Sequence, residues 1–304
     1  MNNSATAKPN AEKMLSYRGL RFQTTDHIRL AADAWGDPAK PPVILLHGGG
    51  QTRHSWKNAA KALAVQGFYA LAVDLRGHGD SGWSPDGVYS SDLFCSDLRF
   101  IAATLASKPA VVGASLGGGT ALLAEGEGPS FLSALVLVDV TPTVQLSSVD
   151  KIRGFMSARL KDGFASIEEA ADAIATYLPH RHRRRNLDSL RKNLRLCPDG
   201  RYHWHWDPAL IDFGDKHVNE SLSIRMTAAA RQLRLPVLLV RGGASELVSN
   251  ADARDFLKIV PSASYVDIRG AGHMVAGDVN DSFTYAVVSF LMKLQLAPQN
   301  SRAR

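Results

Sequence analysis

The chain has 304 residues, of which 45% are hydrophobic and 21% charged, and it carries a formal net charge of +6. This is the composition of an ordinary globular protein that can bury a full core. The polar residues 1–9 lack the apolar centre of a signal peptide, and no later run is long enough to span a bilayer, so we expect a cytoplasmic protein that does not bind membranes.

The cysteines and the basic residues argue against two further classes of protein. Cys95 and Cys197 lie in different predicted segments without the spacing of a redox motif or a zinc site, so we expect free thiols. Positive charge gathers at residues 180–185 and at Arg302 and Arg304. No aromatic or helical readout elements surround these residues, so we expect a solvated or substrate-steering surface and no nucleic-acid binding.

The predicted elements begin after residues 1–14, a polar segment that we expect to be disordered. Alternating apolar residues from Tyr17 to Trp35, around a polar turn at residues 24–27, predict a β-hairpin. Short continuous apolar runs then alternate with amphipathic stretches, as expected when helices cover both faces of a parallel sheet. The predicted strands are residues 43–46, 69–73, 110–112, 135–138, 237–240 and 265–268, and the predicted helices are residues 56–66, 91–105, 118–125, 253–260 and 282–294. The predicted fold class is therefore α/β, with a doubly wound, mostly parallel sheet.

One interval, from about Pro142 to Leu233, interrupts this alternation. It has no buried-strand run but several helical patterns, one of which starts at a capping box of Ser166 and Glu169. We expect a helical cap inserted after the sixth strand, over the carboxyl edge of the sheet, where it would decide which substrates enter. The predicted division is a core of residues 15–141 and 233–296, a cap of residues 142–232, and a C-terminal tail of residues 297–304.

The segment Gly113-Ala114-Ser115-Leu116-Gly117 lies between a predicted strand and a predicted helix. A serine on such a sharp turn, a nucleophile elbow, has a strained backbone and needs small residues two positions before and after it. Both positions are glycine. The turn would lift the Ser115 hydroxyl out of the sheet, and the following helix N-terminus would offer unpaired N–H groups to a developing negative charge. Ser115 is therefore the candidate nucleophile.

A serine hydroxyl needs a base to take its proton and a third group to orient that base. His273, in a glycine-rich loop after the last predicted strand, is the candidate base. Two acids lie at carboxyl ends of predicted strands and could orient it: Glu246, just past residues 237–240, and Asp139, just past residues 135–138. We favour Glu246, in the loop beyond the later strand, and keep Asp139 as the alternative acid or a loop anchor.

Acyl transfer also needs hydrogen-bond donors for the oxyanion of its transition state. Leu116 can offer its backbone N–H because it opens the helix after Ser115. The second donor is expected from His47-Gly48-Gly49-Gly50, at the N–H of Gly49, where glycines let the backbone approach a ligand closely.

Three tryptophans, Trp56, Trp204 and Trp206, are predicted to line the acyl pocket. His203 and His205 would share one strand face, but no third ligand accompanies them, so we predict no metal site. Residues 74–81 (DLRGHGDS) hold several ionisable groups, and we interpret them as a structural turn tied by Asp74 and Arg76.

Together, residues 47–50, residues 74–81, the elbow and the Gly272-His273 loop resemble the α/β-hydrolase superfamily, in the branch that includes esterases, cofactor-free haloperoxidase-like enzymes and epoxide hydrolases. The resemblance covers roughly residues 26–145 and 233–295. It implies an α/β-hydrolase fold, hydrolase activity and no cofactor.

The chain departs from the family's pattern in three places. Relatives that open epoxides or remove halides have an aspartate at the elbow, so Ser115 disfavours both activities. Gly49 and Gly50 replace the bulky residue and proline of many relatives, and Glu246 replaces the commoner aspartate, which keeps Asp139 open as the acid.

We therefore expect a serine hydrolase that cleaves a small or medium carboxylic ester or lactone through an acyl-enzyme intermediate. Alternatives with the same triad are perhydrolysis, carbon-carbon bond hydrolysis and amide hydrolysis. An alternative from another class is a ligand-binding protein without catalysis. The expected partner is a small-molecule ester or lactone, and the oligomeric state is left open, with a homodimer as one option.

Overall fold

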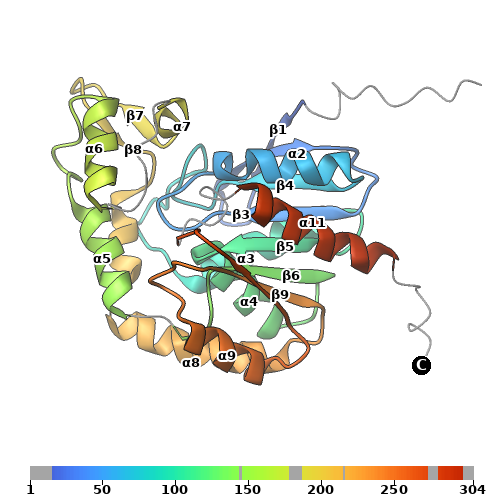
Figure 1. Ribbon diagram of the computed structural model, residues 1–304. Helices are drawn as coiled ribbons and strands as arrows, with labels where there is room; N and C mark the ends of the chain where they lie inside the picture. The colour runs from blue at the N-terminus through green and yellow to red at the C-terminus, as the bar shows by residue number, and fades with distance from the viewer. Residues whose placement is uncertain (1–15, 144–145, 178–186, 215, 273–279, 297–304) are drawn as a thin grey trace, which may run out of the picture.

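A central sheet organises the computed structural model, which describes residues 16–143, 146–177, 187–214, 216–272 and 280–296. Its strands lie in the order β1-β2-β4-β3-β5-β6-β9-β10 (Figure 1). Neighbours from β4 to β10 pair in parallel, and β2 pairs antiparallel with β1 and with β4. The strands are β1 (Arg18–Gln23), β2 (Arg29–Trp35), β3 (Pro42–Leu46), β4 (Tyr69–Val73), β5 (Ala110–Ala114), β6 (Ala134–Val138), β9 (Val237–Gly242) and β10 (Ser264–Ile268). The predicted hairpin and the predicted doubly wound, mostly parallel sheet are both confirmed.

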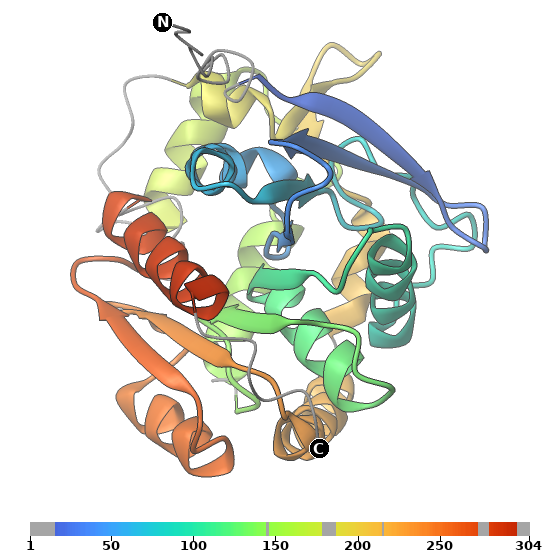
Figure 2. The same ribbon diagram turned by 90° about the vertical axis from the view of Figure 1, so that its right-hand side faces the viewer.

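Helices cover both faces of this sheet, which Figure 2 shows between two layers. On one face α2 packs against α11, and on the other α4 packs against α3 and α8. These helices are α2 (Lys57–Val65), α3 (Ser91–Ala103), α4 (Leu116–Gly126), α8 (Lys216–Gln232), α9 (Asn250–Ile259) and α11 (Asn280–Leu296), and the short 3-10 helix η1 (Arg53–Trp56) precedes α2.

The central strands show why their sequences are apolar without interruption. Along β3, Val43 and Leu45 belong to the core with α2 and α11, whereas Ile44 and Leu46 belong to the core with α3 and α4. Successive side chains of a strand point to opposite faces, so a strand with helices on both faces needs apolar residues at every position.

The segment between β6 and β9 contains more than the predicted helices. It comprises α5 (Leu146–Ser157), α6 (Ile167–Tyr177), α7 (Asp188–Arg191), β7 (Leu194–Leu196), β8 (Tyr202–Trp204) and the 3-10 helix η2 (Pro208–Gly214), followed by α8. All but η2 and α8 lie to one side of the sheet in Figure 1, and we call them, with the residues that connect them, the cap. The β7–β8 hairpin was not predicted because strands of three residues are too short to show a period. The sequence had suggested that residues 216–232 belong to the cap. Because α8 packs against α4, this helix instead belongs to the helix layer of the core.

Local signals at the ends of elements agree with the sequence. The Ser166 hydroxyl accepts a hydrogen bond from Glu169 N at 3.1 Å directly before α6, as the capping box predicts, although the Glu169 carboxylate reaches Ala165 N instead of Ser166 N.

Cys95 and Cys197 are free thiols. No helix in the described ranges is both long and apolar enough to cross a membrane. The basic run at residues 180–185 and the two predicted tails lie outside the described residues.

Candidate active site

The elbow at Ser115 has the strained geometry that its sequence predicts. Ser115 lies between β5 and α4 with φ 45° and ψ −114°, in a region that residues with a side chain rarely adopt. A Cβ on Gly113 would lie 2.6 Å from the backbone of Gly117, and a Cβ on Gly117 would lie 2.6 Å from Leu46. The two glycines are therefore required because β5, α4 and β3 meet at this turn without room for a methyl group.

The predicted oxyanion donors are the backbone N–H groups of Leu116 and Gly49. Leu116 is the first residue of α4, where an N–H has no partner within the helix. Gly49 follows β3, and a Cβ placed on it would meet nothing within 4 Å. The close approach to Ser115 occurs instead at Gly48, whose Cβ would lie 3.3 Å from the serine Cβ, and the positive φ of 72° falls at Gly50. The positions in this loop that need glycine are therefore Gly48 and Gly50, on either side of Gly49.

Two buried histidines hold this loop, residues 47–50, in place. The His47 Nδ1–H donates to Gly48 O at 2.8 Å, and its Nε2 accepts from Leu75 N at 3.0 Å. His78 Nε2 accepts from Gly50 N at 3.2 Å while its Nδ1–H donates to Arg76 O. Burial lowers the pKa of His47 to about 4. The pKa of His78 is lowered to about 3, first by burial and then by the neighbouring His47. Both rings are therefore neutral near pH 7, which each needs in order to donate from one nitrogen and accept at the other.

Asp139 lies next to Ser115 across the sheet. Strands β5 and β6 pair Ala114 with Val138, and Ser115 N donates to Val138 O at 3.1 Å. The Asp139 side chain is buried, with φ 50° at its backbone, and its carboxylate accepts hydrogen bonds from Gly242 N at 3.1 Å and from the Ser245 hydroxyl at 2.5 Å. These donors fix the carboxylate at the end of β6, one strand away from Ser115.

Glu246 lies in a different environment from the one its sequence position suggested. Its side chain is 66% exposed and forms an ion pair at 3.0 Å with Lys151 of α5 in the cap. An exposed carboxylate is screened by water, so it orients a partner less firmly than a buried one. His273, the candidate base, lies outside the described residues, and its position relative to either acid stays a prediction.

The three tryptophans are placed in three different ways. The prediction for Trp56 is wrong, because this residue is 1% exposed and packs against Phe283 in the core between α2 and α11. Trp204 packs against Phe155 and Phe164 inside the cap. Trp206 is the one near the candidate site, since a Cβ on Gly50 would lie 3.8 Å from its indole nitrogen.

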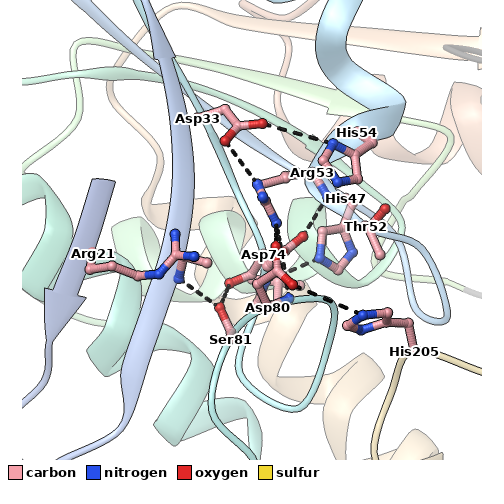
Figure 3. Close-up of polar contacts among 12 residues, drawn as sticks. Arg21, Asp33, His47, Thr52, Arg53, His54, Asp74, Asp80, Ser81 and His205 are labelled. Atoms are coloured by element: carbon pink, nitrogen blue, oxygen red, sulfur yellow. Dashed lines mark hydrogen bonds and ion pairs between the residues drawn. The ribbon is translucent and has the colours of Figure 1, made fainter. Parts of the chain in front are cut away.

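Residues 74–81 form the structural turn that the sequence predicts. The Asp74 carboxylate accepts from Arg53 N at 2.6 Å and pairs with the Arg53 guanidinium (Figure 3). Arg76 forms two hydrogen bonds at 2.6 Å with Asp97 and an ion pair with Asp26. Ion pairs with several hydrogen bonds offset the cost of removing buried charges from water. We therefore interpret these residues as a structural link between loops and not as a second catalytic site.

Sequence reasoning missed three residues that contact Asp139 or Gly50. Ser245 supports Asp139, His78 holds Gly50, and Met156 of α5 would lie 3.4 Å from a Cβ on Gly50. His78 could have been found, because it belongs to the segment that carries the family resemblance. Ser245 and Met156 come from separate parts of the chain, and only the fold brings them to the site.

Comparisons with known proteins agree with this geometry. The family model for the alpha/beta hydrolase fold matches residues 41–278. Esterase Rv0045c of Mycobacterium tuberculosis is 35% identical over 259 residues, which is 82% of each chain. A solved structure of that esterase has a TM-score of 0.71 at 31% identity, and covers 91% of this chain and 92% of its own.

Proteins named for a second hydrolase activity are also similar to this chain, one in sequence and one in structure. A 2-(acetamidomethylene)succinate hydrolase of Mesorhizobium japonicum is 29% identical over 74% of this chain and 78% of its own. The crystal structure of E-2-(acetamidomethylene)succinate hydrolase has a TM-score of 0.79 at 23% identity and covers 91% of this chain and 100% of its own, which is a likeness of fold. Because the family model spans most of the chain and carries the elbow and the loop before it, this protein belongs to the α/β-hydrolase fold family.

Proposed function

We propose that this protein is a serine hydrolase that cleaves a small or medium carboxylic ester or lactone. The observation that carries the proposal is the strained elbow at Ser115, which the N-terminus of α4 follows and Gly48 approaches closely, and we assign the oxyanion to the N–H groups of Leu116 and Gly49. The 35% identity to a mycobacterial esterase supports the choice of an ester as the substrate class.

In the proposed reaction, Ser115 Oγ attacks the ester carbonyl while His273 takes the serine proton. The two backbone N–H groups stabilise the negative charge that develops on the carbonyl oxygen. They need no reorganisation, because the elbow holds Leu116 and the hydrogen-bonded loop of residues 47–50 holds Gly49. Collapse of the tetrahedral intermediate breaks the bond to the alcohol, which receives the proton from His273. Water, activated by the same histidine, then releases the acid and restores the serine.

We assign the orienting acid to Asp139 instead of Glu246. Two observations support the assignment: Asp139 is buried at the end of the strand next to the nucleophile, and two hydrogen bonds hold its carboxylate in one orientation. Glu246 instead faces solvent and pairs with Lys151. A buried, oriented carboxylate stabilises the imidazolium that forms in the transition state more effectively than a solvated one.

A fluorophosphonate probe tests the nucleophile directly, because it labels a serine only where a base and an oxyanion site activate it. We expect the wild-type protein to be labelled and Ser115→Ala to stay unlabelled. Equal labelling of the two proteins would refute the assignment of Ser115, and so would the absence of label on a folded wild type.

Matched substrates test the bond that is cleaved. An ester, an amide and a vinylogous diketone of the same acyl group, assayed under the same conditions, separate ester hydrolysis from the other reactions that this triad supports. We expect the ester to be hydrolysed fastest, and preferential cleavage of either other substrate would replace the ester as the substrate class.

A further inference from the structure

The end of β9 and the loop after it, residues 242–249, hold the carboxylate of Asp139. Strand β9 lies beside β6, and Asp139 is the first residue after β6 (Figure 1). Gly242 N donates to one carboxylate oxygen at 3.1 Å, and the Ser245 hydroxyl donates to the other at 2.5 Å. Each oxygen therefore has a donor from the same segment, and a turn of the carboxylate about its own axis would break both hydrogen bonds.

The direction in which the Ser245 hydroxyl donates is fixed by its other two partners. Leu247 N and Val248 N donate to Ser245 Oγ at 3.1 Å and 3.3 Å. A hydroxyl group has two acceptor lone pairs and one proton. Because both lone pairs already face backbone N–H groups, the proton points to the Asp139 carboxylate, so Ser245 is a fixed donor and not a freely rotating one.

The segment that carries Ser245 is itself anchored to the sheet. Arg241, the residue before it, is buried and donates from Nε to Val248 O at 2.7 Å. The same guanidinium pairs with Asp267 of β10 at 2.8 Å. Arg241 thus joins the far end of the segment to two strands, so the Ser245 hydroxyl is held in place by structure that does not depend on Asp139.

The same segment contacts the backbone directly before His273. Ala244 N donates to Ala271 O at 2.9 Å, and a Cβ on Gly242 would lie 2.2 Å from Gly272 O. His273, the candidate base, is the next residue along the chain. One short segment therefore contacts both the proposed acid and the chain that leads to the proposed base.

We infer that Ser245 is a positioning residue for the hydrolase reaction, which acts by holding the Asp139 carboxylate in the orientation that the imidazole of His273 needs. The inference rests on the proposed function with Asp139 as the acid. The terminal torsion of an aspartate has a broad minimum, so a carboxylate that loses a donor samples several orientations. An acid that orients the base in only a fraction of these lowers the rate of the chemical step and leaves substrate binding as it was.

Ser249 offers a matched control in the same segment. It caps α9, where its hydroxyl accepts from Asp252 N at 3.1 Å and donates to the Asp252 carboxylate at 2.6 Å. Ser249→Ala and Ser245→Ala therefore remove the same group from neighbouring positions, and both are expected to lower the melting temperature. Only Ser245 donates to Asp139, so only its loss is expected to affect catalysis.

Steady-state kinetics with a chromogenic ester compare these variants. We expect Ser245→Ala to lower kcat about tenfold or more while KM stays within about twofold, because a hydrogen bond to a charged group is lost at a residue that acts on the transition state. Ser249→Ala should leave kcat and KM unchanged. Ser245→Thr keeps a hydroxyl and should recover part of kcat. If Ser245→Ala does not fold, Ser245→Cys, with a weak donor of similar size, makes the same comparison.

A double-variant cycle tests whether Ser245 acts through Asp139. Ser245→Ala is made in the wild type and in Asp139→Asn, and its effect on kcat is measured in both backgrounds. We expect a large effect in the wild type and little further loss in Asp139→Asn, since residues that act as a unit are not additive. A serine with a purely structural role would lower kcat by the same factor in both.

Three outcomes would overturn this inference alone, given a low kcat in Asp139→Asn. They are a near-normal kcat in Ser245→Ala, an equal loss in Ser249→Ala, and equal factors in the two backgrounds of the cycle. A normal kcat in Asp139→Asn, or a folded wild type that the fluorophosphonate probe does not label, would instead overturn the proposed acid or nucleophile, and this inference with it.

Discussion

At the scale of single residues, the choice of acid has the sharpest consequence. Asp139→Asn keeps the size of the side chain but removes the charge that would stabilise the histidine as an imidazolium. We expect kcat to fall by about 10²-fold to 10⁴-fold. Steady-state kinetics with a chromogenic ester would measure the change, and circular dichroism would check that the variant is folded.

Glu246→Gln is the matched control for that substitution, because it makes the same chemical change at the acid that the sequence favoured. Since Glu246 is largely exposed and pairs with Lys151, we expect its kcat to stay within about twofold of the wild type. A collapse of kcat in Glu246→Gln, with near-normal turnover in Asp139→Asn, would return the role to Glu246.

Gly117 and Gly119, both in α4, offer a second matched pair of substitutions. A Cβ on Gly117 would lie 2.6 Å from the Leu46 backbone, whereas a Cβ on Gly119 would meet only Met226 at 3.6 Å, an ordinary contact. We expect Gly117→Ala to lower the free energy of unfolding by about 1–3 kcal/mol through overpacking. Gly119→Ala should leave it unchanged or raise it by up to about 1 kcal/mol, as alanine favours a helix. Denaturant unfolding compares the two variants, and equal effects would contradict the steric argument.

At the scale of elements, the loop at residues 47–50 depends on contacts from a second loop and from the segment after β8. His78 accepts from Gly50 N, while the backbone of residues 77–79 pairs with residues 205–207 through Gly79 N to His205 O and Asp207 N to Gly77 O, both at 2.7 Å. Tyr89 OH adds a hydrogen bond of 2.6 Å to Asp207. The backbone that carries Gly49 is therefore fixed by residues from three parts of the chain.

This arrangement predicts that His78 acts as a positioning residue. In His78→Ala the Gly50 N–H loses its acceptor and the loop loses its support, so we expect kcat to fall about tenfold or more while KM changes little. His78→Gln, whose amide oxygen can accept a hydrogen bond, should recover part of the loss. The partly exposed His203, which pairs with Asp199 in the cap, is the control, and His203→Ala should leave kcat unchanged. An unchanged kcat in His78→Ala would refute the positioning role.

At the scale of the whole molecule, the two buried histidines make the stability depend on pH. Their pKa values in the folded protein, about 4 for His47 and about 3 for His78, lie below the value of about 6.5 for an unfolded chain. Between about pH 6.5 and 4 the unfolded state therefore binds more protons than the folded state, so stability is lost as the pH falls. Each histidine contributes a slope of at most about 1.4 kcal/mol per pH unit.

Denaturant unfolding at intervals between pH 7 and 4.5 would measure this slope, in a range where most carboxylates stay ionised. His47→Gln should flatten the slope because it removes one titrating group. The exposed His27, replaced by Asn, should leave it as in the wild type. Stability that stays constant or rises over this range would contradict the neutral, buried state of both histidines.

The sequence by itself determined the fold class and the elbow at Ser115. Continuous apolar runs such as Val43 to Leu46 reveal strands covered on both faces, and Gly113 and Gly117 around Ser115 reveal the elbow, because each is a local pattern set by the chain's own geometry. The strand–turn–helix context lies within one stretch of chain. These features could therefore be read without knowing what packs against them.

Only the tertiary structure decided which acid is buried, which tryptophan lies near the site and what holds the loop at Gly49. Asp139 and Glu246 both follow strands in the sequence, but one is enclosed by Gly242 and Ser245 while the other reaches the cap at Lys151. Trp56 and Trp206 are equally apolar, yet one fills the core and the other lies beside Gly50. Burial depends on neighbours that are distant along the chain, and the charge of a side chain acts strongly only where those neighbours exclude water.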